Sequence, residues 1–187
     1  MLPRIIGIVG RRCVGKDTVA AHLVAKYGYD HRKFAGPLKA GLACLFDLNE
    51  DQLEGELKEV TDPRWGVSPR QIMQFFGTEV MQMKLQELMP YLGRSYATTR
   101  MFTDDDPGKG AFCISDVRFL HEVAAIKEHG GVVLRIVRPH SVGVSGCDRH
   151  ISETESDMIT ADFVIVNSGD FAALHQDIDS LLATLTT

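Results

Sequence analysis

The sequence predicts an α/β fold in which a five-stranded parallel sheet is flanked by helices and carries a helical insertion and a lid. Strand-like apolar runs alternate with helix-like patterns along the chain, which is typical of a parallel sheet. The 187 residues suit a single domain with a sizeable core. A glycine-containing loop, GRRCVGKDT over residues 10–18, directly follows the first apolar run. Strand, loop and helix in this order are the setting in which such a loop binds phosphate.

Five segments, four of them apolar runs, are the expected strands of the sheet. They are Arg4–Val9, a short run near His31–Phe34, AFCIS ending at Asp116, VVLRIV over 132–137 and DFVIV over 162–166. Helices are expected after the loop up to Gly28, over Phe119–His129 and over Phe171–Leu185. Because crossovers between parallel strands are right-handed, we expect these helices on both faces of the sheet.

Residues 36–100 are expected to be mostly helical and to form an insertion after the second strand. Pro37–Phe46 is one candidate helix, and Asn49 is expected to cap another around Glu50–Leu57. The clearest start signal is the stretch Ser68-Pro69-Arg70-Gln71. Its serine suits the N-cap, its proline the first helical position, and its glutamine completes a capping box.

Glycines and polar stretches divide the rest of the chain. Gly77 is expected to break the helix that starts after Ser68, before another helix that runs to about Leu88. Residues 103–110, TDDDPGKG, predict a loop, and the polar residues 139–157 predict a mobile excursion. The expected domain has a core over 1–35 and 111–187, a helical insertion over about 36–100 and a lid over about 138–157.

Composition and charge exclude several classes of partner. The net charge is −5 and the sequence pI is about 5.8, which argues against nucleic acid because its binding needs a basic surface. No stretch approaches the roughly 20 apolar residues that span a bilayer, and the first apolar run is too short for a signal peptide. We therefore expect no membrane partner and a cytoplasmic location. The four cysteines lack metal or redox spacing, which predicts reduced thiols.

The loop at residues 10–18 has the spacing of a phosphate-binding loop. Gly10 is followed, after four residues, by Gly15 and Lys16. Glycines let the backbone turn tightly so that several N–H groups face one anion, and the following helix adds its positive end. Lys16 would reach the β- and γ-phosphates of a nucleotide. The alternative is an ordinary turn between strand and helix that carries a surface lysine.

Asp17 departs from the usual loop. This position normally carries a serine or threonine whose hydroxyl binds Mg²⁺, and Thr18 comes one residue late. Asp17 either holds Mg²⁺ through a water molecule or caps the amides of the loop. The sequence leaves both possibilities open.

Polar residues follow three of the expected strands. Asp116 follows AFCIS, Arg138 follows VVLRIV and Asn167 follows DFVIV. Ligands of open α/β sheets bind beyond the carboxyl ends of the strands, so these positions predict a binding site. The alternative for each residue is a helix cap or a surface position.

Several arginines suit an anionic substrate. Arg70 lies in the first turn of its expected helix, where a cation opposes the helix dipole, and such a local conflict is expected at a binding site. Arg138 and Arg149 flank the predicted excursion, and arginines on a closing lid neutralise charge on a transferring phosphoryl group. Arg118 and Glu122 are four residues apart, so an ordinary ion pair along a helix is the alternative for them.

The chain resembles the deoxynucleoside monophosphate kinases of phages, a branch of the P-loop NMP kinases. The resembling stretches are IIGIVGRRCVGKDTVA, KFAGPLKAGLACLF, SPRQIMQFFGTEV, ISDVRFLHEVAAIKEHGGVVLRIVRP, DRHISETESD and ADFVIVNSGD. They cover much of the chain in the order of the family, and the GKDT form of the loop is similar to the family's own. Residues 78–100 match poorly.

The resemblance implies reversible transfer of the γ-phosphoryl group of ATP to a deoxynucleoside 5′-monophosphate with Mg²⁺, in the host cytoplasm if a phage encodes the chain. With the strand-end residues, it places ATP on Gly10, Arg11, Val14, Gly15, Lys16, Asp17, Thr18 and Asn167. It implies a monophosphate site of Lys39, Arg70, Gln74, Asp116, Arg118 and Glu122. The expected catalytic residues are Lys16, Arg138 and Arg149, and the expected metal residues are Asp17, through water, and Asp116. The D-x-H-x-S-E pattern of the family's lid appears as Asp148, His150, Ser152 and Glu153.

Other functions are left open by the residues alone. A P-loop kinase of another small phosphorylated metabolite, such as phosphomevalonate or dephospho-coenzyme A, would share the loop and the sheet, although SPRQIMQFFGTE and DVRF favour a nucleotide. A non-catalytic ATP-binding regulator would need fewer arginines. The preferred base, the means of distinguishing deoxyribose from ribose and the oligomeric state, for which a homodimer is one option, are not predicted.

Overall fold

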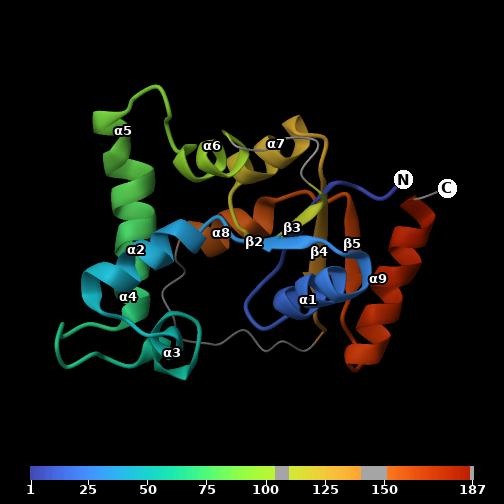
Figure 1. Ribbon diagram of the computed structural model, residues 1–187, viewed down its shortest axis with the longest axis horizontal. Helices are drawn as coiled ribbons and strands as arrows, with labels where there is room; N and C mark the ends of the chain where they lie inside the picture. The colour runs from blue at the N-terminus through green and yellow to red at the C-terminus, as the bar shows by residue number, and fades with distance from the viewer. Residues whose placement is uncertain (104–109, 140–150, 186–187) are drawn as a thin grey trace. The chain divides into compact units, whose positions relative to one another are not determined.

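A computed structural model describes residues 1–103, 110–139 and 151–185 of the chain. The chain divides into two compact units. Unit 1 comprises Met1–Lys33 and Asp105–Thr187, and unit 2 comprises Phe34–Asp104. Unit 1 contains the five strands with α1 and α7–α9, whereas unit 2 is built from the helices α2–α6 (Figure 1).

Unit 1 is organised around the predicted parallel sheet. Its strands are β1 (Ile5–Val9), β2 (Asp30–Arg32), β3 (Phe112–Val117), β4 (Val132–Val137) and β5 (Phe163–Val166). All pairs are parallel, and the order in the sheet is β2-β3-β1-β4-β5. Every residue of β1 is buried, as expected for a central strand covered on both faces. The fold class predicted from the sequence is confirmed.

Helices cover both faces of this sheet. They are α1 (Lys16–Tyr27), α7 (Leu120–Glu128), α8 (Ile151–Met158) and α9 (Phe171–Leu185). On one face, Ile6 of β1 shares a core with Leu23 of α1 and Ile178 of α9. On the other face, α7 approaches β1 so closely that a Cβ atom at Gly7 would lie 2.6 Å from Ile126 Cδ1. A glycine at this position therefore lets α7 pack directly on the sheet.

Unit 2 is helical, as predicted. Its elements are α2 (Gly36–Phe46), α3 (Glu50–Leu53), the 3₁₀-helix η1 (Glu56–Glu59), α4 (Pro69–Gln74), the π-helix η2 (Phe75–Lys84), α5 (Leu85–Leu88) and α6 (Tyr96–Thr103). Leu42 of α2 packs with Ile72 and Met73 of α4 in a small core.

The helix start predicted at Ser68 is confirmed. Ser68 Oγ accepts a hydrogen bond from the Gln71 backbone N–H at 3.3 Å, and Gln71 Oε1 accepts one from the Ser68 N–H at 2.9 Å. Asn49 and Gln52 form the same reciprocal pair at the start of α3. Helix α3 ends at Leu53, whereas the sequence predicted that it would run to about Leu57.

Three expectations about element boundaries are wrong. Gly77 does not break a helix, because it lies inside the continuous π-helix η2, where a Cβ atom would come within 3.2 Å of Leu38 Cδ2. Strand β3 does not end at Asp116 but continues to Val117, which is buried and pairs with Val9 of β1. The stretch 151–158, expected to belong to a mobile excursion, forms helix α8.

Residues 104–109 and 140–150 lie outside the described residues, and so does most of the predicted loop over 103–110. Among the residues described, Cys13, Cys44 and Cys113 are free thiols. Over the same residues, none of the helices has the length and apolar character needed to span a membrane.

Candidate active site

The predicted phosphate loop connects β1 to α1 and depends on two glycines. A Cβ atom at Gly10 would lie 2.5 Å from the Ile136 carbonyl oxygen, so no larger residue fits there. Gly15 has φ of +107°, and a Cβ atom on it would lie 2.9 Å from Asn167 Nδ2. Ile136 of β4 therefore lies against one end of the loop, and Asn167, directly after β5, lies against the other. Neither glycine position has room for a Cβ atom, and Gly15 also has a backbone conformation that favours glycine.

Lys16 is the first residue of α1, and its side chain turns back over the loop. Its Nζ donates hydrogen bonds to the carbonyl oxygens of Gly10 at 2.8 Å and Arg11 at 2.7 Å. Burial, and then the positive charge of Arg118, lower the pKa of Lys16, while Asp17, Cys13 and Asp116 act in the opposite direction. The structure thus brings the loop lysine together with the two strand-end residues Asp116 and Arg118.

Asn167 supports the loop from the end of β5. Its Nδ2 donates a hydrogen bond to the Val14 carbonyl oxygen at 2.8 Å, and its backbone N–H bonds to Val137 of β4. The side chain is buried. Asn167 therefore holds the shape of the loop, while its predicted contact with ATP stays a prediction.

Asp17 follows the lysine, and its carboxylate is held from the sheet. Asp17 Oδ1 accepts a hydrogen bond from Ser115 Oγ at 2.9 Å and lies 3.5 Å from Lys33 Nζ. Burial raises the pKa of Asp17, but the charge of Lys33 and the hydrogen bond from Ser115 outweigh it, so this pKa is lowered overall. Asp17 is thus a stable anion whose side chain is still 73% exposed. Thr18, the next residue in α1, is half-buried.

The acidic residues near the loop suit a Mg²⁺ ion that arrives with a nucleotide. Mg²⁺ usually takes one or two carboxylates together with waters and substrate phosphates. Asp17 and Asp116 both act on the charge of Lys16. In the part of the chain that the structure describes, His, Cys, Asp and Glu form no group of three or more that could hold a metal by itself.

Glu122 is buried and caps the start of α7. Its Oε2 accepts hydrogen bonds from the backbone N–H groups of Arg118 at 2.7 Å and Phe119 at 3.1 Å. Glu155 of α8 accepts a third, from the Leu120 N–H, at 3.0 Å. The Arg118–Glu122 contact is therefore made through the backbone of Arg118. Glu122 shapes the turn that carries Arg118, and its predicted substrate contact stays a prediction.

We expect a Glu122→Gln variant to gain stability relative to the native chain as pH rises from about 5 to about 8. Burial, and then the charge of Asp116, raise the pKa of Glu122 to about 8 from 4.5. A carboxyl group whose pKa is higher in the folded chain loses its stabilising contribution as pH rises through this window, whereas glutamine does not titrate. Urea denaturation at both pH values should show a shift on the order of 2 kcal/mol in favour of the variant.

The control for this comparison is Glu128→Gln, which removes an exposed carboxylate from the same helix. The contrary outcome is that the unfolding free energies of the Glu122→Gln variant and the native chain differ by the same amount at both pH values. That result would show that the Glu122 carboxyl does not titrate between them.

The loop is also joined to α8. Arg11 Nη2 lies 3.0 Å from Asp157 Oδ2 of this helix. The same region is bound from the sheet, because Arg135 of β4 donates from Nη2 to the carbonyl oxygens of Ser156 at 2.9 Å and Ile159 at 2.6 Å.

Of the residues predicted around the lid, Arg138 is exposed directly after β4. Arg149, Asp148 and His150 lie outside the described residues, and the side chains of Ser152 and Glu153 lie outside them too.

In unit 2, the two predicted phosphate-binding cations are paired with nearby carboxylates. Lys39 Nζ of α2 donates to Glu54 Oε1 at 2.6 Å, and the lysine side chain is only 18% exposed. Arg70 Nη1 of α4 donates to Glu59 Oε1 at 3.2 Å. Gln74 is the last residue of the same helix and is half-buried. Both cations are thus held by carboxylates from the short stretch 54–59.

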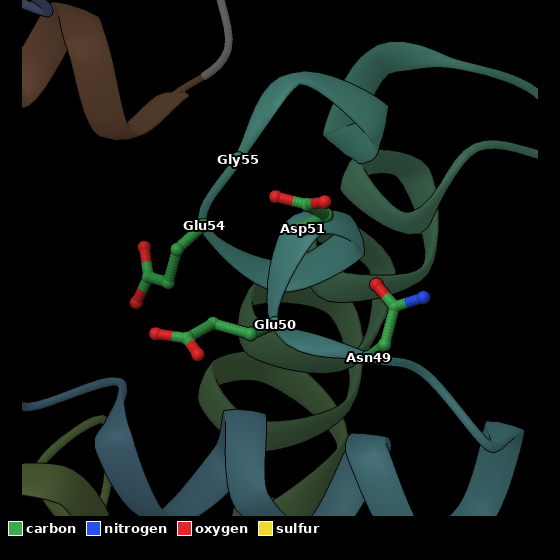
Figure 2. A pocket seen from close by; sticks show the side chains of 5 residues that line it. All are labelled: Asn49, Glu50, Asp51, Glu54 and Gly55. Atoms are coloured by element: carbon green, nitrogen blue, oxygen red, sulfur yellow. The ribbon is translucent and has the colours of Figure 1, made fainter.

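A hollow in unit 2 is lined by Asn49, Glu50, Asp51, Glu54 and Gly55. Figure 2 shows that the carboxylates of Glu50 and Glu54 extend to the same side of α3, while that of Asp51 lies apart from them. Three carboxylates repel a phosphate group, so this hollow is not the candidate monophosphate site.

The sequence reasoning missed several residues that contact the predicted site. They are Ser115 and Lys33 beside Asp17, His31 beside Ser115, and the carboxylates Glu54 and Glu59. A polar Ser115 near the end of an otherwise apolar strand was the one local signal. The other contacts depend on tertiary packing that a linear pattern does not report.

Comparison with known proteins identifies close relatives of this chain. Residues 46–178 match the family model described as deoxynucleotide monophosphate kinase. The chain is 36% identical over 185 residues to an Acanthamoeba polyphaga mimivirus protein provisionally named a deoxynucleotide monophosphate kinase, with 94% of each covered. It is 27% identical over 147 residues to the deoxynucleotide monophosphate kinase of Escherichia phage RB69, covering 78% of this chain and 56% of the phage protein.

Solved structures share the fold at low sequence identity. Shikimate kinase from Aquifex aeolicus matches with a TM-score of 0.54 at 15% identity, covering 97% of this chain and 98% of that one. Shikimate kinase from Acinetobacter baumannii matches with a TM-score of 0.51 at 14% identity, covering 98% and 94%. These likenesses concern the architecture of the sheet and its helices.

Proposed function

The chain belongs to the deoxynucleotide monophosphate kinase family, and we propose that it transfers the γ-phosphoryl group of ATP to a deoxynucleoside 5′-monophosphate, giving dNDP and ADP. Beside the family, one observation carries the proposal. The loop from Gly10 to Gly15 stands between a buried strand and a helix, and Lys16 reaches back over the loop. This is the arrangement of a triphosphate-binding loop.

The donor triphosphate is proposed to bind at this loop. The residues concerned are Gly10, Arg11, Val14, Gly15, Lys16, Asp17 and Thr18, with Asn167 beneath them. The first turn of α1 adds the positive end of its dipole to the charge of Lys16. Mg²⁺ would neutralise charge on the bound phosphates, with Asp17, through a water molecule, and Asp116 as its protein partners.

The acceptor monophosphate is proposed to bind the cations and polar groups that the family resemblance implies. They are Lys39, Arg70, Gln74, Asp116, Arg118 and Glu122. Lys39 and Arg70 already bind carboxylates in this structure, which supports a role in holding an anion. A monophosphate carries more charge than a carboxylate and offers an arginine the same forked geometry.

The reaction needs no protein base, because phosphoryl transfer of this kind works by alignment and charge neutralisation. Lys16, Arg138 and Arg149 are proposed to neutralise the charge that spreads over the phosphoryl oxygens. The stretch over about 138–157 is proposed to act as a lid that excludes water, since water would otherwise accept the phosphoryl group. The host cytoplasm stays a prediction, and a homodimer stays one option for the oligomeric state.

A coupled ADP-release assay with each dNMP tests the function. We expect at least one dNMP to stimulate ADP formation from ATP and Mg²⁺ about 10²-fold or more above the rate without acceptor, because bound acceptor replaces water at the transferred group. Phosphomevalonate and dephospho-coenzyme A, in matched reactions, serve as controls for another metabolite kinase. If no dNMP stimulates the reaction, the substrate assignment is wrong, and stimulation by neither set would favour a non-catalytic ATP-binding protein.

A further inference from the structure

Three side chains from three elements of unit 1 form a hydrogen-bonded chain beside the phosphate loop. His31 Nε2 of β2 lies 2.8 Å from Ser115 Oγ of β3, and Ser115 Oγ lies 2.9 Å from Asp17 Oδ1 of α1. β2 and β3 are neighbouring parallel strands, with His31 in register with Cys113. Two paired strands therefore hold a residue in the first turn of the helix that follows the loop.

The proton positions along this chain follow from its chemistry. Asp17 is an anion and only accepts hydrogen bonds, so the single Ser115 proton is donated to it. Ser115 Oγ is then left to accept from His31, which requires a proton on His31 Nε2. Ser115 is only 2% exposed, so water has little access to replace either partner. The chain thus runs in one direction, from the imidazole through the hydroxyl to the carboxylate.

This arrangement differs from the usual pair at a P-loop. In the usual loop a serine or threonine after the lysine supplies a hydroxyl, and an aspartate at a strand end supplies the carboxylate. Here the loop position carries the carboxylate of Asp17, and the neighbouring strand β3 carries the hydroxyl of Ser115. The two groups are hydrogen-bonded to each other, and Asp116, the next residue of β3, is a second carboxylate near the end of that strand.

We propose that Ser115 and His31 are positioning residues that fix the orientation of the Asp17 carboxylate toward the Mg²⁺-nucleotide. One carboxylate oxygen is tied to the sheet by Ser115, with Lys33 3.5 Å from the same oxygen, while the side chain as a whole stays largely exposed. A carboxylate fixed in this way loses less conformational freedom when it accepts a hydrogen bond from water on the metal. The inference rests on the proposed donor site at the loop.

The experiment compares ADP binding with Mg²⁺ and with EDTA by isothermal titration calorimetry. In the Ser115→Ala variant we expect the ratio of the two dissociation constants to fall about 10-fold, the typical loss when a metal ligand loses its supporting hydrogen bond. The dissociation constant in EDTA should change less than about 2-fold, since the loop itself is intact. A merely structural role for Ser115 would change the melting temperature or both dissociation constants together.

A matched pair of variants at His31 tests the direction of the hydrogen-bonded chain and leaves the buried Ser115 in place. His31 is exposed, so its variants leave the core unchanged. His31→Leu removes the donor and should lower the Mg²⁺ effect in the same sense as Ser115→Ala. His31→Gln retains an N–H donor and should restore most of the effect. Equal behaviour of the two His31 variants, or an unchanged ratio in folded Ser115→Ala, would overturn the proposal.

The same measurements separate this inference from the proposed function. The native chain could bind ADP with an affinity that depends on Mg²⁺ while no dNMP stimulates ADP release. The kinase assignment would then fail, and the Ser115 and His31 variants would still decide the positioning role. If ADP affinity in the native chain does not depend on Mg²⁺, the positioning role is wrong even where dNMP phosphorylation is observed. Should Ser115→Ala not fold, the exposed His31 pair decides alone.

Discussion

Replacing Lys16 with alanine is expected to lower kcat for dNMP phosphorylation about 10³-fold, which is the scale of losing one charged group at a transferring phosphoryl. The Lys16 ammonium is held over the loop by two carbonyl oxygens, 2.8 and 2.7 Å away. A triphosphate offers the same ammonium charged oxygens, which are stronger acceptors than carbonyls. Steady-state kinetics with saturating ATP and dNMP measure the change.

The fold should tolerate this substitution. Lys16 begins α1, and the helix is anchored by buried side chains further along it, including Val19 and Leu23. Alanine favours the helix, and the two lost hydrogen bonds go to partly solvated loop carbonyls. The melting temperature should therefore change by only a few degrees.

Lys26→Ala provides the matched control on the same helix. Lys26 is half exposed and pairs with Asp179, far from the loop in the sequence, so its loss should leave kcat unchanged. If the Lys16→Ala variant is folded and keeps kcat within about 10-fold of the native chain, Lys16 does not act on the transferred group and the loop assignment is wrong.

The sheet could be predicted from the sequence because its strands carry their own signal. Strands covered on both faces are nearly continuous apolar runs, and IIGIV of β1 and VVLRIV of β4, which is interrupted only by Arg135, are of this kind. The start of α4 was also predictable, since Ser68 and Gln71 cap it through local hydrogen bonds. Signals contained within a few residues were therefore reliable.

Boundaries set by tertiary contacts were not predictable. Glycine commonly breaks a helix, yet η2 continues through Gly77, where a Cβ atom would lie 3.2 Å from Leu38 Cδ2 of α2. Helix α8 has a polar sequence with little to distinguish it from a loop, and its end is bound by Arg135 from β4. In each case the deciding partner lies far away in the sequence.

The same distinction holds within the candidate site. Gly10, Gly15 and Lys16 are adjacent in the chain, so their spacing alone indicated a phosphate loop. The partners of Asp17 come from β2 and β3, and only the strand order brings them together. Glu122 looked like an ion-pair partner of Arg118, but its burial directs it to the backbone N–H groups instead.

Replacing Arg70 with alanine is expected to lower kcat/KM for the dNMP about 10²-fold, the scale of one strong hydrogen bond between charged groups. Affinity for ADP should not change, because Arg70 is proposed to bind the acceptor and is not among the residues proposed for the donor loop. Arg70→Lys should recover only part of the loss, since lysine lacks the forked geometry that fits a phosphate. Initial rates at varied dNMP, with ADP titrations alongside, measure both effects.

The stability of the Arg70→Ala variant should be close to that of the native chain, for two opposing reasons. The variant loses a partly exposed ion pair with Glu59, worth up to about 1 kcal/mol. It also removes a cation from the first turn of α4, where the helix dipole disfavours positive charge. Lys84→Ala removes an exposed cation elsewhere in unit 2 and should change neither rate nor stability. If Arg70→Ala resembles this control in kcat/KM, Arg70 does not bind the acceptor.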